Sequence, residues 1–275
     1  MSSRGSVDGC WSKIARAKEH RDLLESHSKQ TFSVEANRPR FGAKFEADTS
    51  EYVFYVNYMP DLTAAFDRAS LILGDAVANL RSALDYLVFQ LAIWNTNGNV
   101  RDERNVQFPI TDKPEWFTKA AKKYLGEIHP DHIAVIERYQ GYYRLHEEVS
   151  VGLYFHPLVM LRDLSDTDKH RLLTSVMVPS SAMSLEMGAA AIPILLFGSI
   201  QETMSGVRSL GIERVELNAE LTRAKLPAGL LRNDLEMAGY VVGQIALTDG
   251  RPTVPVLDKV AAVVVKIVRE FEPLF

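Results

Sequence analysis

Hydrophobic residues recur at steps of three and four over a long stretch in the first third of the chain. After Pro60, apolar side chains occupy positions 62, 66, 69, 73, 76, 80, 84, 87, 91 and 94. This spacing predicts one continuous helix over 60–94, about 50 Å long at 1.5 Å per residue. Few small domains need a helix of that length unless it is the central member of a bundle, so we expect a helical bundle around it.

Shorter elements precede and follow this helix in the sequence. Further helices are expected over the ranges 6–28, 113–125, 130–139 and 151–164. Asp112 is the expected N-cap of the helix over 113–125, because Pro114 falls in its first turn. β-Branched and aromatic residues over 30–38 and 51–58 suggest a hairpin or two extended segments.

The hydrophobic period changes after about residue 171. Val215, Leu217, Ala219 and Leu221 alternate with polar residues, which is typical of a half-buried strand. Other strands are expected over 172–178, 192–197 and 240–247, and helical spacing returns over 256–272.

The predicted fold class is therefore α+β. We expect a helical bundle over 1–171 that includes a hairpin near 30–58, and a β-rich unit over 172–254. A C-terminal helix over 255–275 is expected to pack back on the bundle.

Composition is that of an ordinary globular protein, with 47% apolar residues, 24% charged residues and a net charge of −4. This charge argues against a protein that binds nucleic acid by bulk positive charge, but it leaves a local basic groove open. The single cysteine, Cys10, excludes an internal disulfide and a cysteine-based metal site.

Localisation and cofactors follow from what the sequence lacks. The most apolar run, 188–200, contains Pro193 and is shorter than the ~20 residues that a membrane span needs. The N-terminus has no apolar segment typical of a secretory signal. We expect a cytoplasmic protein with no membrane association. We expect no metal and no cofactor, because HExxH, Walker and GxGxxG motifs are missing.

Two segments carry the candidate chemistry. The helix segment GDAVANLRSALDYLVFQL, 74–91, has a polar stripe and, on another face, an i, i+4 pair of opposite charges. The stripe consists of Asp75, Asn79, Ser82 and Tyr86, and the pair of Arg81 and Asp85. Both patterns fit either a solvent-facing helix or a buried network in which each polar group needs a partner.

The second segment is SDTDKHR, 165–171, which follows an expected helix. It is either a solvated charged turn at a helix end or a catalytic cluster. In a catalytic cluster His170 would be the general base beside Lys169 or Arg171, with Asp168 next to them.

In motif order the chain resembles an uncharacterised family of bacterial and phage proteins. The resemblance rests on GDAVANLRSALDYL, on Phe108–Pro109–Ile110, and on Leu161–Arg162–Asp163–Leu164 followed by Asp168–Lys169–His170–Arg171. It is more loosely similar to the HEPN superfamily of helical nucleotide-binding proteins and metal-independent ribonucleases. The superfamily motif has an arginine, then four to six residues, then a histidine. Here Arg81 matches the arginine and Tyr86 stands at the histidine position.

Two hypotheses for function remain open. The first is a HEPN-like protein that binds RNA or a nucleotide, with endoribonuclease-like chemistry if it is catalytic. Arg81 and Lys169 would then stabilise the phosphorane charge and His170 would be the base. Asn79 and Asp85 would orient them. Positions five apart on one helix, such as Arg81 and Tyr86, diverge by ~140°. A homodimer could instead bring together Arg81 and a base from different chains. The second is a non-enzymatic interaction protein in which the same polar residues form a buried network.

Overall fold

The structure is a computed structural model. It describes residues 5–37, 40–143, 156–170, 175–187, 190–194, 208–209, 218, 220–224, 236–237 and 240–275. Helices predominate among these residues, and the strands form two antiparallel sheets, so the predicted α+β class is confirmed. The chain divides into two compact units. A helical unit comprises Met1–Glu25, Ser70–Leu173 and Thr253–Phe275, and a strand-containing unit comprises Ser26–Ala69 and Thr174–Pro252.

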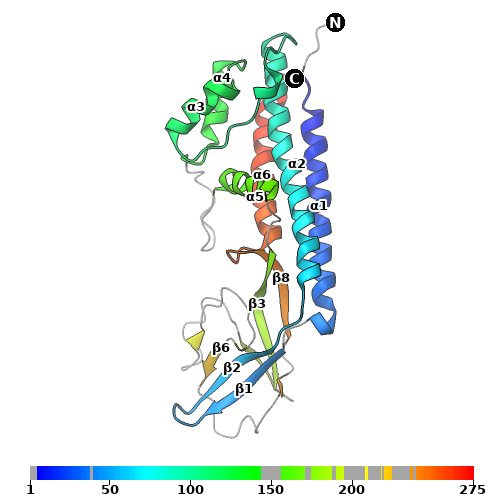
Figure 1. The fold of residues 1–275 in the computed structure, drawn as a ribbon, viewed down its shortest axis with the longest axis vertical. Helices are drawn as coiled ribbons and strands as arrows, with labels where there is room; N and C mark the ends of the chain where they lie inside the picture. Colours follow the sequence, from blue (N-terminus) through cyan, green and yellow to red (C-terminus); the bar gives the residue numbers. More distant parts are fainter. Residues whose placement is uncertain are drawn as a thin grey trace. The chain divides into compact units, whose positions relative to one another are not determined.

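The long helix expected over 60–94 is α2, Thr63–Asn95 (Figure 1). Its apolar stripe is buried as the spacing predicts, with exposures of 0–1% for the leucines that form it. These are Leu73, Leu80, Leu84, Leu87 and Leu91. Nearly complete burial of one stripe along five turns holds α2 at the centre of the helical unit.

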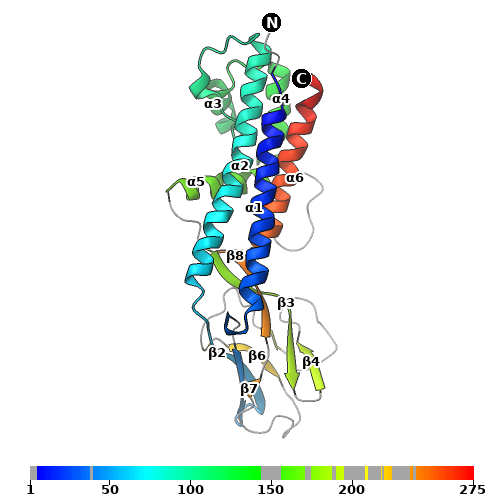
Figure 2. The ribbon, with the colours of Figure 1, turned by 90° about the vertical axis from the view of Figure 1, so that its right-hand side faces the viewer.

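Helices α1, Asp8–Ser33, and α6, Thr253–Phe271, run alongside α2 in the helical unit (Figures 1 and 2). Arg21 of α1 is paired with Asp258 of α6 at 2.8 Å from its Nε, and the Ser6 amide donates to Gln90 Oε1 of α2 at 2.9 Å. The C-terminal helix was expected from its spacing despite its many valines. Burial of one face of α6 outweighs the low helix propensity of valine.

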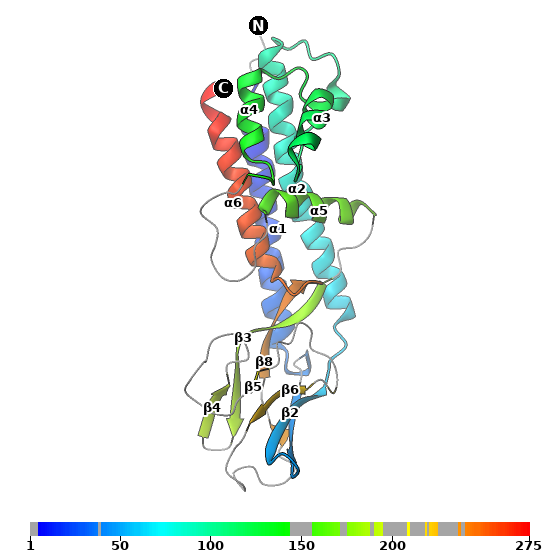
Figure 3. The same ribbon diagram turned by 90° about the vertical axis from the view of Figure 1, so that its left-hand side faces the viewer.

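Three shorter helices complete the helical unit: α3, Pro114–Tyr124, α4, Pro130–Arg138, and α5, Pro157–His170. Helix α5 runs across the long helices rather than along them (Figures 1 and 3). It ends at His170 and so includes most of the SDTDKHR segment, which continues the helix beyond the expected end at 164 instead of forming a turn after it. The predicted cap at Asp112 is wrong: the N-cap of α3 is Lys113, without a side-chain hydrogen bond.

The first strand lies later in the chain than expected. Residues 30–33 belong to α1, because Thr31 and Phe32 are buried and continue its helical spacing. A 3-10 turn, Glu35–Asn37, follows, and the strand is β1, Arg40–Glu46. It pairs with β2, Glu51–Tyr58, as an antiparallel hairpin.

In the strand-containing unit, the hairpin belongs to a five-stranded sheet of order β5-β6-β2-β1-β7. Its other strands are β5, Arg208–Ser209, β6, Glu220–Ala224, and β7, Glu236–Met237. The hairpin therefore pairs with strands from the later part of the chain, whereas the sequence suggested that it accompanies the helices. The alternating residues 215, 217 and 219 lie outside the described residues.

A second sheet of the same unit has the order β4-β3-β8. Its strands are β3, Ser175–Met187, β4, Ala190–Ile194, and β8, Tyr240–Leu247. Strands β3 and β8 pair from Ser175↔Leu247 to Ser184↔Tyr240, with a register shift between Pro179 and Met183. Proline has no N–H to donate, which fits its place at an irregularity.

Candidate functional site

Two side chains of α2 hold the backbone of one residue in the loop before α3. Arg81 Nη2 donates a hydrogen bond to the Phe108 carbonyl oxygen at 2.7 Å, and the Phe108 amide donates to Asp85 Oδ1 at 2.9 Å. Arg81 Nη2 also lies 3.1 Å from Asp85 Oδ1. Because Phe108 is fully buried, its backbone groups need partners within the protein. We call these three residues the Phe108 clamp.

Gln140, just after α4, holds the rest of this loop and is itself fully buried. Its Oε1 accepts a hydrogen bond from the Thr111 amide at 2.8 Å, and its Nε2 donates to the Pro109 carbonyl at 3.0 Å. The Gly141 amide donates to the Thr111 carbonyl at 2.8 Å. The extended segment around Phe108–Pro109–Ile110 thus finds its hydrogen-bond partners on α2 and in the residues after α4.

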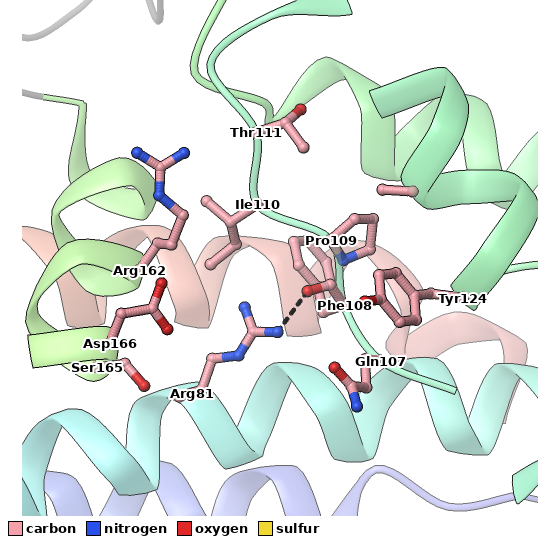
Figure 4. A pocket seen from close by; sticks show the side chains of 11 residues that line it. Arg81, Gln107, Phe108, Pro109, Ile110, Thr111, Tyr124, Arg162, Ser165 and Asp166 are labelled. Atoms are coloured by element: carbon pink, nitrogen blue, oxygen red, sulfur yellow. Dashed lines mark hydrogen bonds between the residues drawn. The ribbon is translucent and has the colours of Figure 1, made fainter. Parts of the chain in front are cut away.

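A pocket of about 250 Å³ opens beside the clamp (Figure 4). It is lined by Arg81 of α2, by residues 107–111, by Ala120 and Tyr124 of α3, and by Arg162, Ser165 and Asp166 of α5. The Arg81 side chain reaches into it and meets the Phe108 carbonyl at its edge. The pocket therefore brings together the RSALD, FPI and LRDLSD segments that stood out in the sequence.

Arg162 joins α5 to the start of α3. Its Nε donates to Asp163 Oδ1 at 2.9 Å, and its Nη1 lies 3.6 Å from Asp112 Oδ1. The Asp112 carboxylate therefore pairs across the site instead of capping α3. These carboxylates are 40% and 56% exposed, so each pair contributes little to stability on its own.

The polar stripe of α2 does not line this pocket. The Asp75 side chain is 66% exposed and lies 3.9 Å from His20 Nδ1 of α1. The Asn79 side chain donates from Nδ2 to the Asp75 carbonyl of its own helix at 2.8 Å, and Ser82 is half-buried. Tyr86 is 43% exposed and its ring lies against Gly9 of α1, where a Cβ would collide with it. The stripe therefore faces α1 and solvent.

Gly74 brings the beginning of the GDAVANL segment into contact with the DKHR segment. A Cβ added at Gly74 would collide with the Asp168 carboxylate of α5, so the glycine permits this close approach. Burial raises the pKa of Asp168, and the negative charge of Asp75 raises it further. Asp168 is therefore a helix-packing contact that is easier to protonate than an ordinary aspartate.

Lys169 and His170 form the end of α5. Their side chains, and Arg171 as a whole, lie outside the described residues. Ser165 and Asp166, one turn earlier, share the pocket with Arg81. The helix that carries the expected base therefore contributes to the same site as the expected cation.

Several pocket and loop residues were not candidates in the sequence: Gln107, Tyr124, Gln140, Arg162 and Ser165. Arg162 and Ser165 lie in or beside segments quoted for the family resemblance, and their spacing of three would place both on one face of a helix. Gln140 has no such signal, because its role depends on contacts with residues about 30 positions earlier.

Neither protein-family models, nor curated proteins, nor solved structures match this chain. Over the described ranges, no group of three or more histidine, cysteine and acidic side chains is placed to hold a metal ion. No helix in the described part of the chain combines the length and apolarity needed to cross a membrane.

Proposed function

We propose that this protein is a non-enzymatic interaction protein whose polar motif residues form a network within the helical unit. The observation that carries the proposal is the Phe108 clamp, in which both charged residues of RSALD are bound to one buried backbone unit. A catalytic arginine has its donors aimed at charge that develops in the transition state. Arg81 Nη2 instead donates to the Phe108 carbonyl and lies beside the Asp85 carboxylate, both of which belong to the protein itself.

The position of Tyr86 supports the same proposal. Tyr86 stands where the HEPN-like pattern has its histidine, but its ring lies against Gly9 of α1, whereas Arg81 reaches into the pocket. The two residues that the pattern would pair do not share a surface.

The proposal that this protein binds a partner rests on exposed apolar side chains. The helical unit exposes several large ones, namely Leu23, Leu71, Tyr86, Trp94 and Trp116. Such side chains are candidate contacts for another protein, including a second copy of this chain in a homodimer. We place the protein in the cytoplasm, where a lone buried thiol such as Cys10 stays reduced.

The test compares RNA cleavage with stability in the purified protein. We expect no cleavage of single-stranded RNA above background by the wild-type chain, and identical traces for His170→Ala. We also expect Arg81→Met to lower the melting temperature. Cleavage that disappears in His170→Ala would refute the non-enzymatic proposal.

A second candidate function is the HEPN-like one, RNA or nucleotide binding with metal-independent phosphoryl transfer. One observation favours it: Arg81 shares its pocket with the α5 turn that precedes Lys169 and His170. If this candidate holds, His170→Ala should lower the cleavage rate by about 10²–10⁴-fold, as loss of a general base does.

A further inference from the structure

The pocket beside the clamp has an unused hydrogen-bonding group on each of two walls. On the α2 wall, Arg81 commits Nη2 to Phe108 and Asp85, and its Nε and Nη1 form no hydrogen bond with the described residues. The side chain is only 18% exposed, so its donors are largely shielded from bulk solvent. Shielded donors that lack protein partners favour a ligand with hydrogen-bond acceptors.

On the α5 wall, the Ser165 hydroxyl has no hydrogen-bond partner among the described residues, although Ser165 is only 6% exposed and lines the pocket. A serine in a helix commonly donates to the carbonyl four residues earlier. Thr167 on the same helix does so, with 2.7 Å from its Oγ1 to the Asp163 carbonyl, but Ser165 does not. The hydroxyl is therefore available to a molecule in the pocket (Figure 4).

Part of the remaining lining is apolar and the volume is small. Ile110, Pro109 and Ala120 contribute hydrocarbon surface. About 250 Å³ corresponds to roughly eight water molecules at ~30 Å³ each. Pockets that hold drug-sized ligands measure about 300–1,000 Å³, so this smaller pocket suits a molecule of about ten non-hydrogen atoms better than a whole nucleotide.

The charges around the pocket indicate how much negative charge such a ligand carries. Arg81 lies 3.1 Å from Asp85, and Arg162 lies 2.9 Å from Asp163. Asp166 adds a carboxylate to the lining itself. The lining itself therefore carries two guanidinium groups and one carboxylate, which leaves one positive charge for a ligand, while the neighbouring carboxylates of Asp85 and Asp163 disfavour a phosphate dianion or a polyanion.

We propose that this pocket binds a small organic monocarboxylate, with its oxygens on Arg81 and the Ser165 hydroxyl and its apolar part against Ile110 and Pro109. Such a ligand would bridge α2 and α5, so binding would stabilise the helical unit by mass action. The site does not require catalysis, and it differs from the nucleotide site of the second candidate function in ligand charge and size.

The test is an NMR titration of the ¹⁵N-labelled full chain at constant ionic strength, with sodium benzoate as the probe. Benzamide serves as the uncharged isostere, and AMP and inorganic phosphate as phosphate probes. We expect saturable shifts of the amides over 107–111 with a Kd of about 1 mM, typical for a ligand of this size. Benzamide should bind at least about tenfold more weakly, because it lacks the charge-assisted bonds.

Three variants locate the site without disturbing the clamp. Ser165→Ala removes only an unbonded hydroxyl and should weaken benzoate about tenfold while the melting temperature stays unchanged. Ala120→Phe should fill the pocket and abolish binding. Thr167→Ala, the matched control on α5, lies outside the pocket and should bind benzoate like the wild type.

Several outcomes would overturn the proposal. Shifts that stay absent or linear with benzoate, equal binding of benzamide, or an unchanged Kd in Ser165→Ala would each do so. Tighter binding of AMP than of benzoate at the same amides would assign the pocket to a nucleotide instead. None of these results alters the clamp contacts, so failure of the ligand site and failure of the non-enzymatic proposal remain distinguishable.

Discussion

Two faces of α2 carry polar side chains that look alike in the sequence but lie in different surroundings. On one face, Arg81 and Asp85 are 18% and 34% exposed and hold the backbone of the buried Phe108. On the other, the Asp75 side chain is 66% exposed and lies 3.9 Å from His20 Nδ1. The first face supplies the hydrogen bonds that regular secondary structure would otherwise give to the Phe108 backbone. The second face mainly contacts solvent and α1.

The difference shows where a polar residue on a long helix matters for stability. A buried non-helical segment cannot satisfy its own N–H and C=O groups, and each group left without a partner costs about 1–3 kcal/mol. Around Phe108 the partners are side chains from α2 and Gln140. The largest losses of stability should therefore come from substitutions that remove a hydrogen-bond partner of this loop's backbone, and not from substitutions of surface charges.

The largest effect is expected at Gln140, which is fully buried. Gln140→Leu keeps the approximate volume but leaves the Thr111 amide and the Pro109 carbonyl without partners. We expect unfolding to become easier by about 3 kcal/mol, measured by urea denaturation. Gln30→Leu, at an exposed site on α1, is the matched control and should shift stability by less than about 0.5 kcal/mol. Equal small effects at both glutamines would contradict the proposed role of Gln140.

The comparison between the two faces is tested directly by charge-removing variants on α2. Asp85→Asn removes half of the ion pair and weakens the acceptor for the Phe108 amide, so we expect a loss of about 1–2 kcal/mol. Asp75→Asn makes the same chemical change on the exposed face and should lie within about 0.5 kcal/mol of the wild type. Denaturation curves with equal midpoints for the two variants would remove the distinction between the faces.

A buried polar side chain that lacks partners within the described ranges provides a contrast to the clamp. His156, just before α5, is 9% exposed, and neither of its ring nitrogens has a hydrogen-bond partner in the part of the chain that the structure describes. Burial lowers its pKa below the ordinary value of 6.5. As pH falls below 6.5 the unfolded chain binds a proton that the folded chain does not, so stability falls by up to about 1.4 kcal/mol per pH unit.

His156→Leu should remove this contribution, so that the difference in stability between variant and wild type grows from pH 6.5 downward. The measurement is urea denaturation at several pH values between 5 and 8. His132, whose pKa is also lowered by burial, continues to contribute in both proteins. Parallel pH profiles for wild type and His156→Leu would show that His156 is protonated equally in the folded and unfolded states.

The smallest effect is a coupling between α2 and α5. Alanine in place of a helical glycine normally stabilises by about 1 kcal/mol, but a Cβ at Gly74 would collide with the Asp168 carboxylate. We expect Gly74→Ala to be nearly neutral in the wild type and stabilising by about 1 kcal/mol in an Asp168→Ala background. The same gain in both backgrounds would mean that the two side chains do not contact each other.

Periodicity predicted the helices of the helical unit, although not all of their ends. Helix α2 followed from steps of three and four, and α6 did so although it is rich in valine, because the spacing of its buried face persists. At the end of α1, β-propensity was misleading: Thr31 and Phe32 looked extended, but they continue the helical spacing from Leu24 and are buried. Burial in tertiary structure outweighed local preference there.

The candidate site was only partly predictable. The i, i+4 spacing indicated the Arg81–Asp85 pair, and Phe108–Pro109–Ile110 stood out as a motif. Their contact joins residues more than 20 positions apart, and a single sequence carries no signal for such a pairing. The same holds for Gln140, whose partners lie in that loop.

The most direct test of the Phe108 clamp is hydrogen exchange of the Phe108 amide, measured by NMR in the wild type and in Asp85→Asn. We predict a protected amide in the wild type, because it donates to Asp85 Oδ1 at 2.9 Å. In the variant its exchange should accelerate at least about tenfold, while the Thr111 amide, held by Gln140, stays protected. A Phe108 amide that exchanges freely in the wild type, or at the same rate in both proteins, would contradict the clamp and the non-enzymatic role that rests on it.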